Sequence, residues 1–126
     1  MIKICGVTTE ADAAMVAASG ADALGLIFAE STRRVDRRIA RHIVTQRSDV
    51  RCVGVMRGLS DDAIVDIVDE VGVDTVQLHD PVDESTLVAL RDRSIDIWRA
   101  VPLRQRGLTT IEVGFVSALL IDGPAP

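Results

Sequence analysis

The sequence predicts an α/β fold in which about six short parallel strands alternate with helices. Two observations predict it. Apolar runs short enough for strands recur about every two dozen residues, and amphipathic stretches with helix-start signals lie between them. The runs are mostly apolar on both faces, which is typical of parallel strands buried on both sides. We expect the strands to begin near Ile2, Ala23, Arg51, Thr75, Ile95 and Ala118.

Residues that commonly cap helices precede four of the amphipathic stretches. A side-chain oxygen at such a position accepts hydrogen bonds from the free backbone N–H groups of the first turn. The caps are expected at Thr8 or Thr9, Asp36, Ser60 and Asp83. Gly20 and Gly72 follow the first and third helices, where a left-handed residue is favoured. The fifth helix, between Gly107 and Val116, is expected to be short because its threonines and Gly114 disfavour it.

The chain length allows one domain, residues 1–126, but not a complete eight-stranded barrel. The 126 residues can bury a core, whereas a closed barrel of eight strand–helix repeats needs ~200 to 250 residues. Repeated strand–helix units alone fit an open sheet and a barrel equally well. The sequence motifs have to decide between the two.

Composition argues against several classes of partner. The net charge is −5, and Phe28, Trp98 and Phe115 are too few for a base-stacking platform, so nucleic acid is not expected as a partner. No apolar run approaches the ~18 residues of a membrane span, and the N-terminus has no signal-peptide pattern. We therefore expect a cytoplasmic protein that acts on a small molecule, with Cys5 and Cys52 as free thiols.

Polar residues follow several strands at their carboxyl ends, where functional groups gather in parallel strand–helix folds. Cys5 ends the first strand, and Arg33 lies in the loop after the second. Gln77 and His79 lie at the end of the fourth strand and share side-chain parity, and Asp122 ends the sixth. A thiol, a guanidinium, an imidazole and a carboxylate are thus expected at one pole.

These residues occur in motifs that resemble those of the phosphoribosylanthranilate isomerases of tryptophan biosynthesis, in the same order and at suitable spacing. The resemblance implies a barrel of the TIM type, here incomplete after the sixth strand. The motifs are Lys3-Ile4-Cys5-Gly6-Val7-Thr8, Gly20-Ala21-Asp22-Ala23-Leu24-Gly25, Val53-Gly54-Val55, Val76-Gln77-Leu78-His79 and Leu119-Leu120-Ile121-Asp122.

The resemblance implies an enzyme without metal or cofactor that performs an Amadori rearrangement of N-(5-phosphoribosyl)anthranilate. Cys5 would be the general base and Asp122 the general acid. Arg33 would bind the substrate carboxylate, and Gln77 and His79 would contact the substrate. The family's phosphate-binding loops lie beyond the sixth strand, where this sequence ends, so the resemblance leaves the phosphate site unassigned.

The residues themselves leave plainer alternatives open. Cys5 alone would more often be a buried apolar residue, Asp122 a turn residue, and His79 a structural histidine. The arginine-rich stretch 32–41 is most simply a solvated helix face, with Ile39 and Ile43 turned inward. A further expectation is that Lys3, which shares the parity of Cys5, favours its thiolate.

Two more residues, Asp80 and Arg99, lie near the pole. Asp80 stands where the family usually has glycine, so a left-handed backbone is expected there, tolerated by aspartate at some cost. Its negative charge would oppose an anionic substrate. Arg99 could offset that charge, although a salt bridge at the surface or barrel rim is the plainer interpretation.

Three functions remain at this point. The leading hypothesis is the isomerase, acting on a sugar phosphate. The second is an inactive truncated half-barrel that acts only by association, either as a homo-oligomer or with a complementing chain that covers its open edges. The third is a metal-dependent sugar-phosphate epimerase, whose usual histidine and acidic ligands are not found in the sequence.

Overall fold

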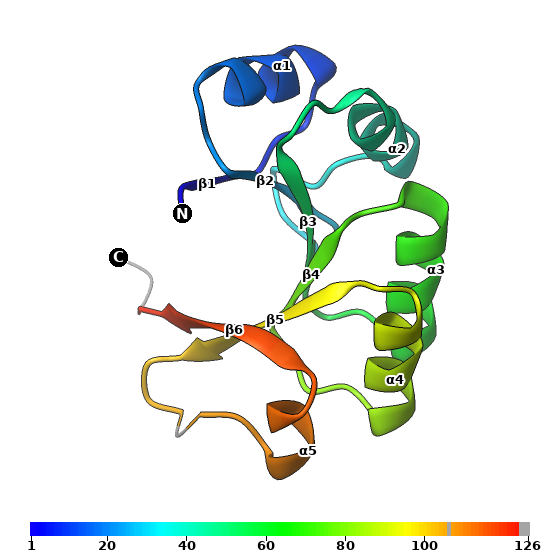
Figure 1. Cartoon of the computed structure of the whole chain (residues 1–126), viewed down its shortest axis with the longest axis vertical. Helices are drawn as coiled ribbons and strands as arrows, with labels where there is room; N and C mark the ends of the chain where they lie inside the picture. The colour runs from blue at the N-terminus through cyan, green and yellow to red at the C-terminus, as the bar shows by residue number, and fades with distance from the viewer. Residues whose placement is uncertain (106, 124–126) are drawn as a thin grey trace.

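The computed structural model, which describes residues 1–105 and 107–123, contains one parallel sheet whose strands follow the order of the chain, β1-β2-β3-β4-β5-β6 (Figure 1). Helices connect successive strands, so the predicted strand–helix alternation is confirmed. The elements are β1 (Lys3–Cys5), α1 (Glu10–Ala18), β2 (Ala23–Ile27), α2 (Arg37–Gln46), β3 (Arg51–Met56), α3 (Asp61–Val71), β4 (Thr75–Leu78), α4 (Glu84–Asp92), β5 (Asp96–Pro102), α5 (Thr110–Val113) and β6 (Val116–Asp122).

The sheet curves into an open half-barrel of TIM-barrel type. The helices lie on its outer side, and β1 and β6 border its open side (Figure 1). Among the described residues, β1 is paired only with β2 and β6 only with β5. The outward-facing Leu119 and Ile121 of β6 are 45% and 55% exposed. Both edges of the half-barrel are therefore unpaired, and β6 presents apolar surface.

Two apolar layers hold the sheet in place. The larger lies between its outer face and the helices, and includes Leu24, Met56, Ile67 and Leu87. Side chains alternate across a strand, so every second residue points into the concave side, here called the lumen. The lumen holds a smaller cluster of Ala23, Val53 and Trp98, against which Ala118 and Leu120 pack. This cluster forms an apolar floor for the polar groups nearer the carboxyl ends of the strands.

The predicted helix caps are largely present. The side chains of Thr9, Asp36 and Ser60 accept hydrogen bonds from the first turns of α1, α2 and α3. Gly72 follows α3 with φ 80°. The side chain of Asp83 makes no capping bond at α4, although the helix begins there as predicted.

Asp61 replaces that capping bond. Its Oδ2 accepts from the backbone N–H of Asp83 at 2.9 Å and from the hydroxyl of Thr86 at 2.7 Å. The start of α4 is thus held by the first turn of the preceding helix.

Two local predictions were wrong. The sixth strand begins at Val116 rather than Ala118, and its register with β5 shifts just after Val116, between Ile97 and Trp98. Ile39 is 40% exposed because it lines a surface hollow beside α1, whereas Ile43 is buried as predicted. In the described part of the chain, no helix is long and apolar enough to cross a membrane.

Candidate active site

Cys5 lies at the carboxyl end of β1 and faces the lumen, where it packs against Ile27, Ala29 and Val55. Gly25 of β2 stands beside it in the register of the sheet. A Cβ atom on Gly25 would lie 2.8 Å from the Cys5 sulfur. The glycine therefore provides the space that the thiol occupies. Cys52 belongs to the outer apolar layer, on the other face of the sheet.

Arg33 folds back from the loop after β2 and lies over the end of β1. Its Nη1 donates to the backbone carbonyl of Cys5 at 3.3 Å. Gly6 makes this approach possible, because a Cβ there would lie 2.6 Å from Nη1, and its φ of +87° also favours glycine. The guanidinium is thus held over the end of β1 by the backbone carbonyl of Cys5.

Four polar side chains lie in one series across the lumen from β1 to β6, which we call the lumen row: Lys3, Gln77, His79 and Asp122. The Nζ of Lys3 donates to Gln77 Oε1. Gln77 Nε2 lies 3.0 Å from His79 Nε2. His79 Nδ1 in turn lies 3.3 Å from Asp122 Oδ2. The row connects the strand that carries Cys5 to the strand that carries Asp122.

Burial controls the protonation of two members of the row. Burial lowers the pKa of the Lys3 ammonium, while the charges of Cys5 and Asp122 act to raise it. Burial also lowers the pKa of His79 from its ordinary value of 6.5, against the opposing effect of Asp122. An imidazole whose pKa lies below 6.5 is uncharged at neutral pH, so we expect His79 to be a neutral ring with one N–H.

A hollow of about 640 Å³ opens beside Asp122 and His79 at the carboxyl end of the half-barrel. Arg57 and Arg104 also line it, and the sequence analysis did not select either of them. Arg57 directly follows β3. It could have been found by the same rule that selected the residues after the other strands. The two arginines bring positive charge to a site that also holds two carboxylates.

Asp80 differs from its prediction. Among the described residues, Ser94 is the one non-glycine with a positive φ, so Asp80 does not have the left-handed backbone that was expected. Its Oδ2 instead accepts from the backbone N–H of Gly58 at 2.7 Å. Asp80 therefore links the loop after β4 to the loop after β3.

Arg99 also differs from both of its predicted roles. It faces α5 on the outer side of the sheet and is only 2% exposed, so it neither offsets Asp80 nor lies at the rim. Its Nε donates to Glu112 at 2.8 Å, and its Nη1 donates to the carbonyls of Leu78 and Ala100. Burial acts to raise the pKa of Glu112, but hydrogen bonds from Thr109 and Arg99 outweigh it and lower the pKa.

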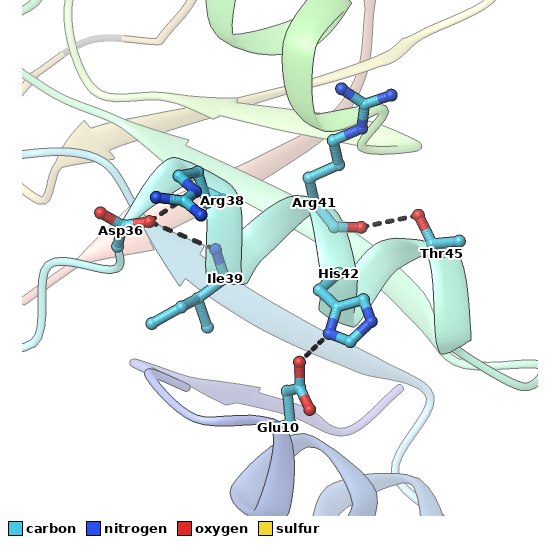
Figure 2. A pocket seen from close by; sticks show the side chains of 7 residues that line it. All are labelled: Glu10, Asp36, Arg38, Ile39, Arg41, His42 and Thr45. Atoms are coloured by element: carbon cyan, nitrogen blue, oxygen red, sulfur yellow. Dashed lines mark hydrogen bonds and ion pairs between the residues drawn. The ribbon is translucent and has the colours of Figure 1, made fainter.

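A second hollow, of about 530 Å³, lies on the outer side between α1 and α2 (Figure 2). Figure 2 shows Glu10 of α1 and His42 of α2 pointing toward one another, with His42 Nδ1 hydrogen-bonded to Glu10 Oε1. Asp36 caps α2 through the N–H groups of Arg38 and Ile39. The exposed side chains of this stretch agree with a solvated helix face.

The structure brings all five predicted site residues to the same end of the half-barrel. Cys5 and Arg33 meet at β1, and Gln77, His79 and Asp122 belong to the lumen row. Their roles in catalysis and substrate binding stay predictions. Within the described ranges, no three His, Cys, Asp or Glu side chains are grouped to hold a metal ion.

Comparison with known proteins gives a consistent result. The model of the family described as N-(5'-phosphoribosyl)anthranilate (PRA) isomerase matches residues 2–125. The isomerase of Chlamydia felis is 38% identical over 109 residues, which are 84% of this chain and 52% of the relative. The crystal structure of the isomerase from Thermus thermophilus superposes with a TM-score of 0.81 at 30% identity, covering 99% of this chain and 63% of that one.

A second solved relative is a phosphoribosylanthranilate isomerase in complex with reduced 1-(o-carboxyphenylamino)-1-deoxyribulose 5-phosphate. It has a TM-score of 0.78 at 29% identity and covers 98% of this chain and 66% of that one. This chain therefore spans between about half and two thirds of the length of these relatives. With its family match over nearly all of its residues and a lumen that carries Cys5 and Asp122, the chain belongs to the N-(5'-phosphoribosyl)anthranilate isomerase family.

Proposed function

We propose that this chain carries the acid and the base of a phosphoribosylanthranilate isomerase. The reaction would convert N-(5-phosphoribosyl)anthranilate to 1-(2-carboxyphenylamino)-1-deoxyribulose 5-phosphate. One observation carries the proposal. The lumen row leads from Lys3, which shares the inner face of β1 with Cys5, to Asp122 on β6 at the opposite edge of the sheet. A substrate between Cys5 and Asp122 could meet both groups. We place this activity in the cytoplasm.

Ring opening is the step assigned to Asp122. Its protonated carboxyl group would give a proton to the ribose ring oxygen, and the bond between that oxygen and C1′ would break. The anilino nitrogen supplies its lone pair to form the protonated Schiff base. This step needs a carboxyl group that still holds its proton near neutral pH.

Proton removal is the step assigned to Cys5. The iminium carbon withdraws electrons and acidifies the neighbouring C2′ proton, so a thiolate is a sufficient base. Removal of that proton gives an enolamine, which tautomerises to the ketone product. Lys3, two residues before Cys5 on the same face of β1, places a positive group on the side of the strand where the thiolate acts.

Positive charge near these two groups suits an anionic substrate. Arg33, held over Gly6 next to Cys5, would bind the anthranilate carboxylate through its guanidinium. Arg57 and Arg104 line the hollow beside Asp122 and would contribute to anion binding there. Gln77 and His79 remain proposed substrate contacts. The Gln77 amide is already hydrogen-bonded through Oε1 to Lys3 and through Nε2 to His79.

The test is the loss of fluorescence of phosphoribosylanthranilate on incubation with the purified chain at several protein concentrations. We expect Cys5→Ser and Asp122→Asn to abolish turnover. Cys52→Ser, on the outer face, and Asp66→Asn, exposed on α3, are matched controls that should retain it. Folded protein without turnover, or turnover that persists in both lumen variants, would refute the proposal.

The open edges favour a second candidate function, association without catalysis. β1 and β6 each have one unpaired side among the described residues, and Leu119 and Ile121 are exposed on β6. Unpaired strands with apolar side chains tend to pair with another chain. Concentration-dependent association in analytical ultracentrifugation, together with absence of turnover at every concentration, would support this candidate. A folded monomer at all concentrations would exclude it.

A further inference from the structure

The lumen row has a chemical direction that follows from its donors and acceptors. The ammonium of Lys3 has donors only, so it fixes the carbonyl oxygen of the Gln77 amide toward itself. The amide nitrogen, Nε2, must then face His79, at 3.0 Å. An amide nitrogen is also a donor only. His79 Nε2 must therefore be the unprotonated acceptor of that pair.

The second ring nitrogen of His79 then carries the proton. A neutral imidazole has one N–H, and Nε2 is occupied as an acceptor, so the hydrogen lies on Nδ1. Nδ1 lies 3.3 Å from Asp122 Oδ2, so its N–H is beside that oxygen and favours negative charge there. An imidazolium would instead place a second N–H against the Gln77 amide nitrogen, with two donors facing each other. The row is fully satisfied only with a neutral ring in this tautomer.

The surroundings of His79 favour the neutral ring. Its charged neighbours are Asp122 and Asp80, which act to raise its pKa, and Arg57 and Lys3, which act to lower it. Burial is the largest effect and lowers the pKa. The ring should therefore keep one proton over the neutral pH range.

We propose that Lys3, Gln77 and His79 are positioning residues that fix the Nδ1–H tautomer of His79, and so determine which oxygen of Asp122 delivers the acid proton. Nδ1–H lies beside Oδ2 and favours negative charge on it, which leaves Oδ1 as the oxygen that holds the proton. When Oδ1 releases it to the ring oxygen, the new carboxylate would accept a charge-assisted hydrogen bond from Nδ1–H. The part of this inference that concerns Asp122 rests on the proposed function.

The tautomer can be measured without any activity. Two-bond ¹H–¹⁵N correlation spectra of the imidazole rings distinguish an Nδ1–H from an Nε2–H ring. The chain has two histidines, and a His42→Asn variant identifies the signals of His79. At about pH 8, above the ordinary pKa of imidazole, we expect His79 to show a protonated Nδ1 and an unprotonated Nε2. An Nε2–H ring in the wild-type chain would overturn the inference.

Variants of Lys3, the one lysine in the sequence, test the origin of that preference. Lys3→Met frees the Gln77 amide to rotate, so a fraction of Nε2–H ring should appear. Lys3→Arg keeps a donor and should preserve the Nδ1–H ring. Comparison of the backbone spectra verifies that both variants fold. An unchanged Nδ1–H signal in folded Lys3→Met would show that Lys3 does not set the tautomer, and would overturn the inference.

Turnover separates this inference from the proposed function. If the chain is active, Gln77→Leu should lower kcat about 10-fold or more, since general acid catalysis contributes about 10²- to 10⁴-fold, while KM changes little. A rise in KM with unchanged kcat would show that Gln77 acts only as a substrate contact, and would overturn the positioning role. An Nδ1–H ring in an inactive chain would refute the isomerase proposal and leave the tautomer assignment in place.

Discussion

Replacing Gly25 by alanine should displace the Cys5 thiol without removing any functional group. The new Cβ would lie 2.8 Å from Cys5 Sγ and 3.1 Å from its Cα. Ordinary contact begins at 3.4 Å, so the sulfur must move by at least 0.6 Å. A misplacement of about 1 Å near a reacting group can cost about 100-fold in rate, so we expect kcat to fall roughly 10- to 100-fold. Overpacking should also reduce the free energy of unfolding by about 1–3 kcal/mol.

Gly54→Ala is the matched control for this experiment. Gly54 lies in β3 on the outer face, and its added Cβ would meet the flexible end of Met56 at 3.0 Å. We expect a comparable loss of stability in urea denaturation with turnover of phosphoribosylanthranilate unchanged. Wild-type kcat in Gly25→Ala, or an equal loss of kcat in both variants, would refute the reasoning that places the thiol at the reacting atoms.

Three further predictions concern other sites. Glu112→Gln should lower the free energy of unfolding by about 3–5 kcal/mol in urea denaturation, because it leaves the buried Arg99 guanidinium without its anion. The double variant Glu112→Leu/Arg99→Met, which removes both charges, should recover most of this loss. The free energy of unfolding should fall as the pH drops below 6.5, because the unfolded chain takes up a proton before His79, whose pKa is lowered, does so in the folded chain. His79→Gln should lack this part of the pH dependence, whereas the same change at the other histidine should keep it. In Gly6→Ala, at a φ of +87°, the added Cβ would lie 2.6 Å from Arg33 Nη1 and displace the guanidinium. This variant should raise KM more than it lowers kcat, and an unchanged KM would argue against a carboxylate site at Arg33.

The strand–helix alternation could be predicted because each repeat carries its own local signals. Thr9, Asp36 and Ser60 cap their helices through side-chain oxygens, and Gly72 ends α3 in the left-handed region, as the sequence patterns indicated. Local patterns were less informative where a neighbouring element determines exposure. Ile39 fits a helical stripe with Ile43, but whether it is covered depends on the position of α1 relative to α2.

The sequence predicted which residues lie at the site, but not which of their side chains contact one another. Parity placed Gln77 and His79 on one face, and the strand ends placed Cys5 and Asp122 at one pole. The distances across the lumen depend on the curvature of the sheet, which no local pattern encodes. For the same reason, the contact from Lys3 to Gln77 could not be inferred.

Arg99 was misplaced for a different reason. Both faces of a buried parallel strand are apolar, so the sequence does not indicate which parity faces inward. In the structure Trp98 faces the lumen and Arg99 the helices.

The strictly sequential strand order has a consequence for how the chain can be assembled on a ribosome. Each strand pairs only with the strand of the adjacent repeat, so no pairing has to wait for a distant segment to be synthesised. Each pairing joins strands about two dozen residues apart, so it closes only a short loop. A strand that emerges can therefore pair with the strand of the repeat before it, and the edge of the sheet moves forward by one repeat at a time. Among the described residues, the unpaired side of β6 is the last edge formed in this order.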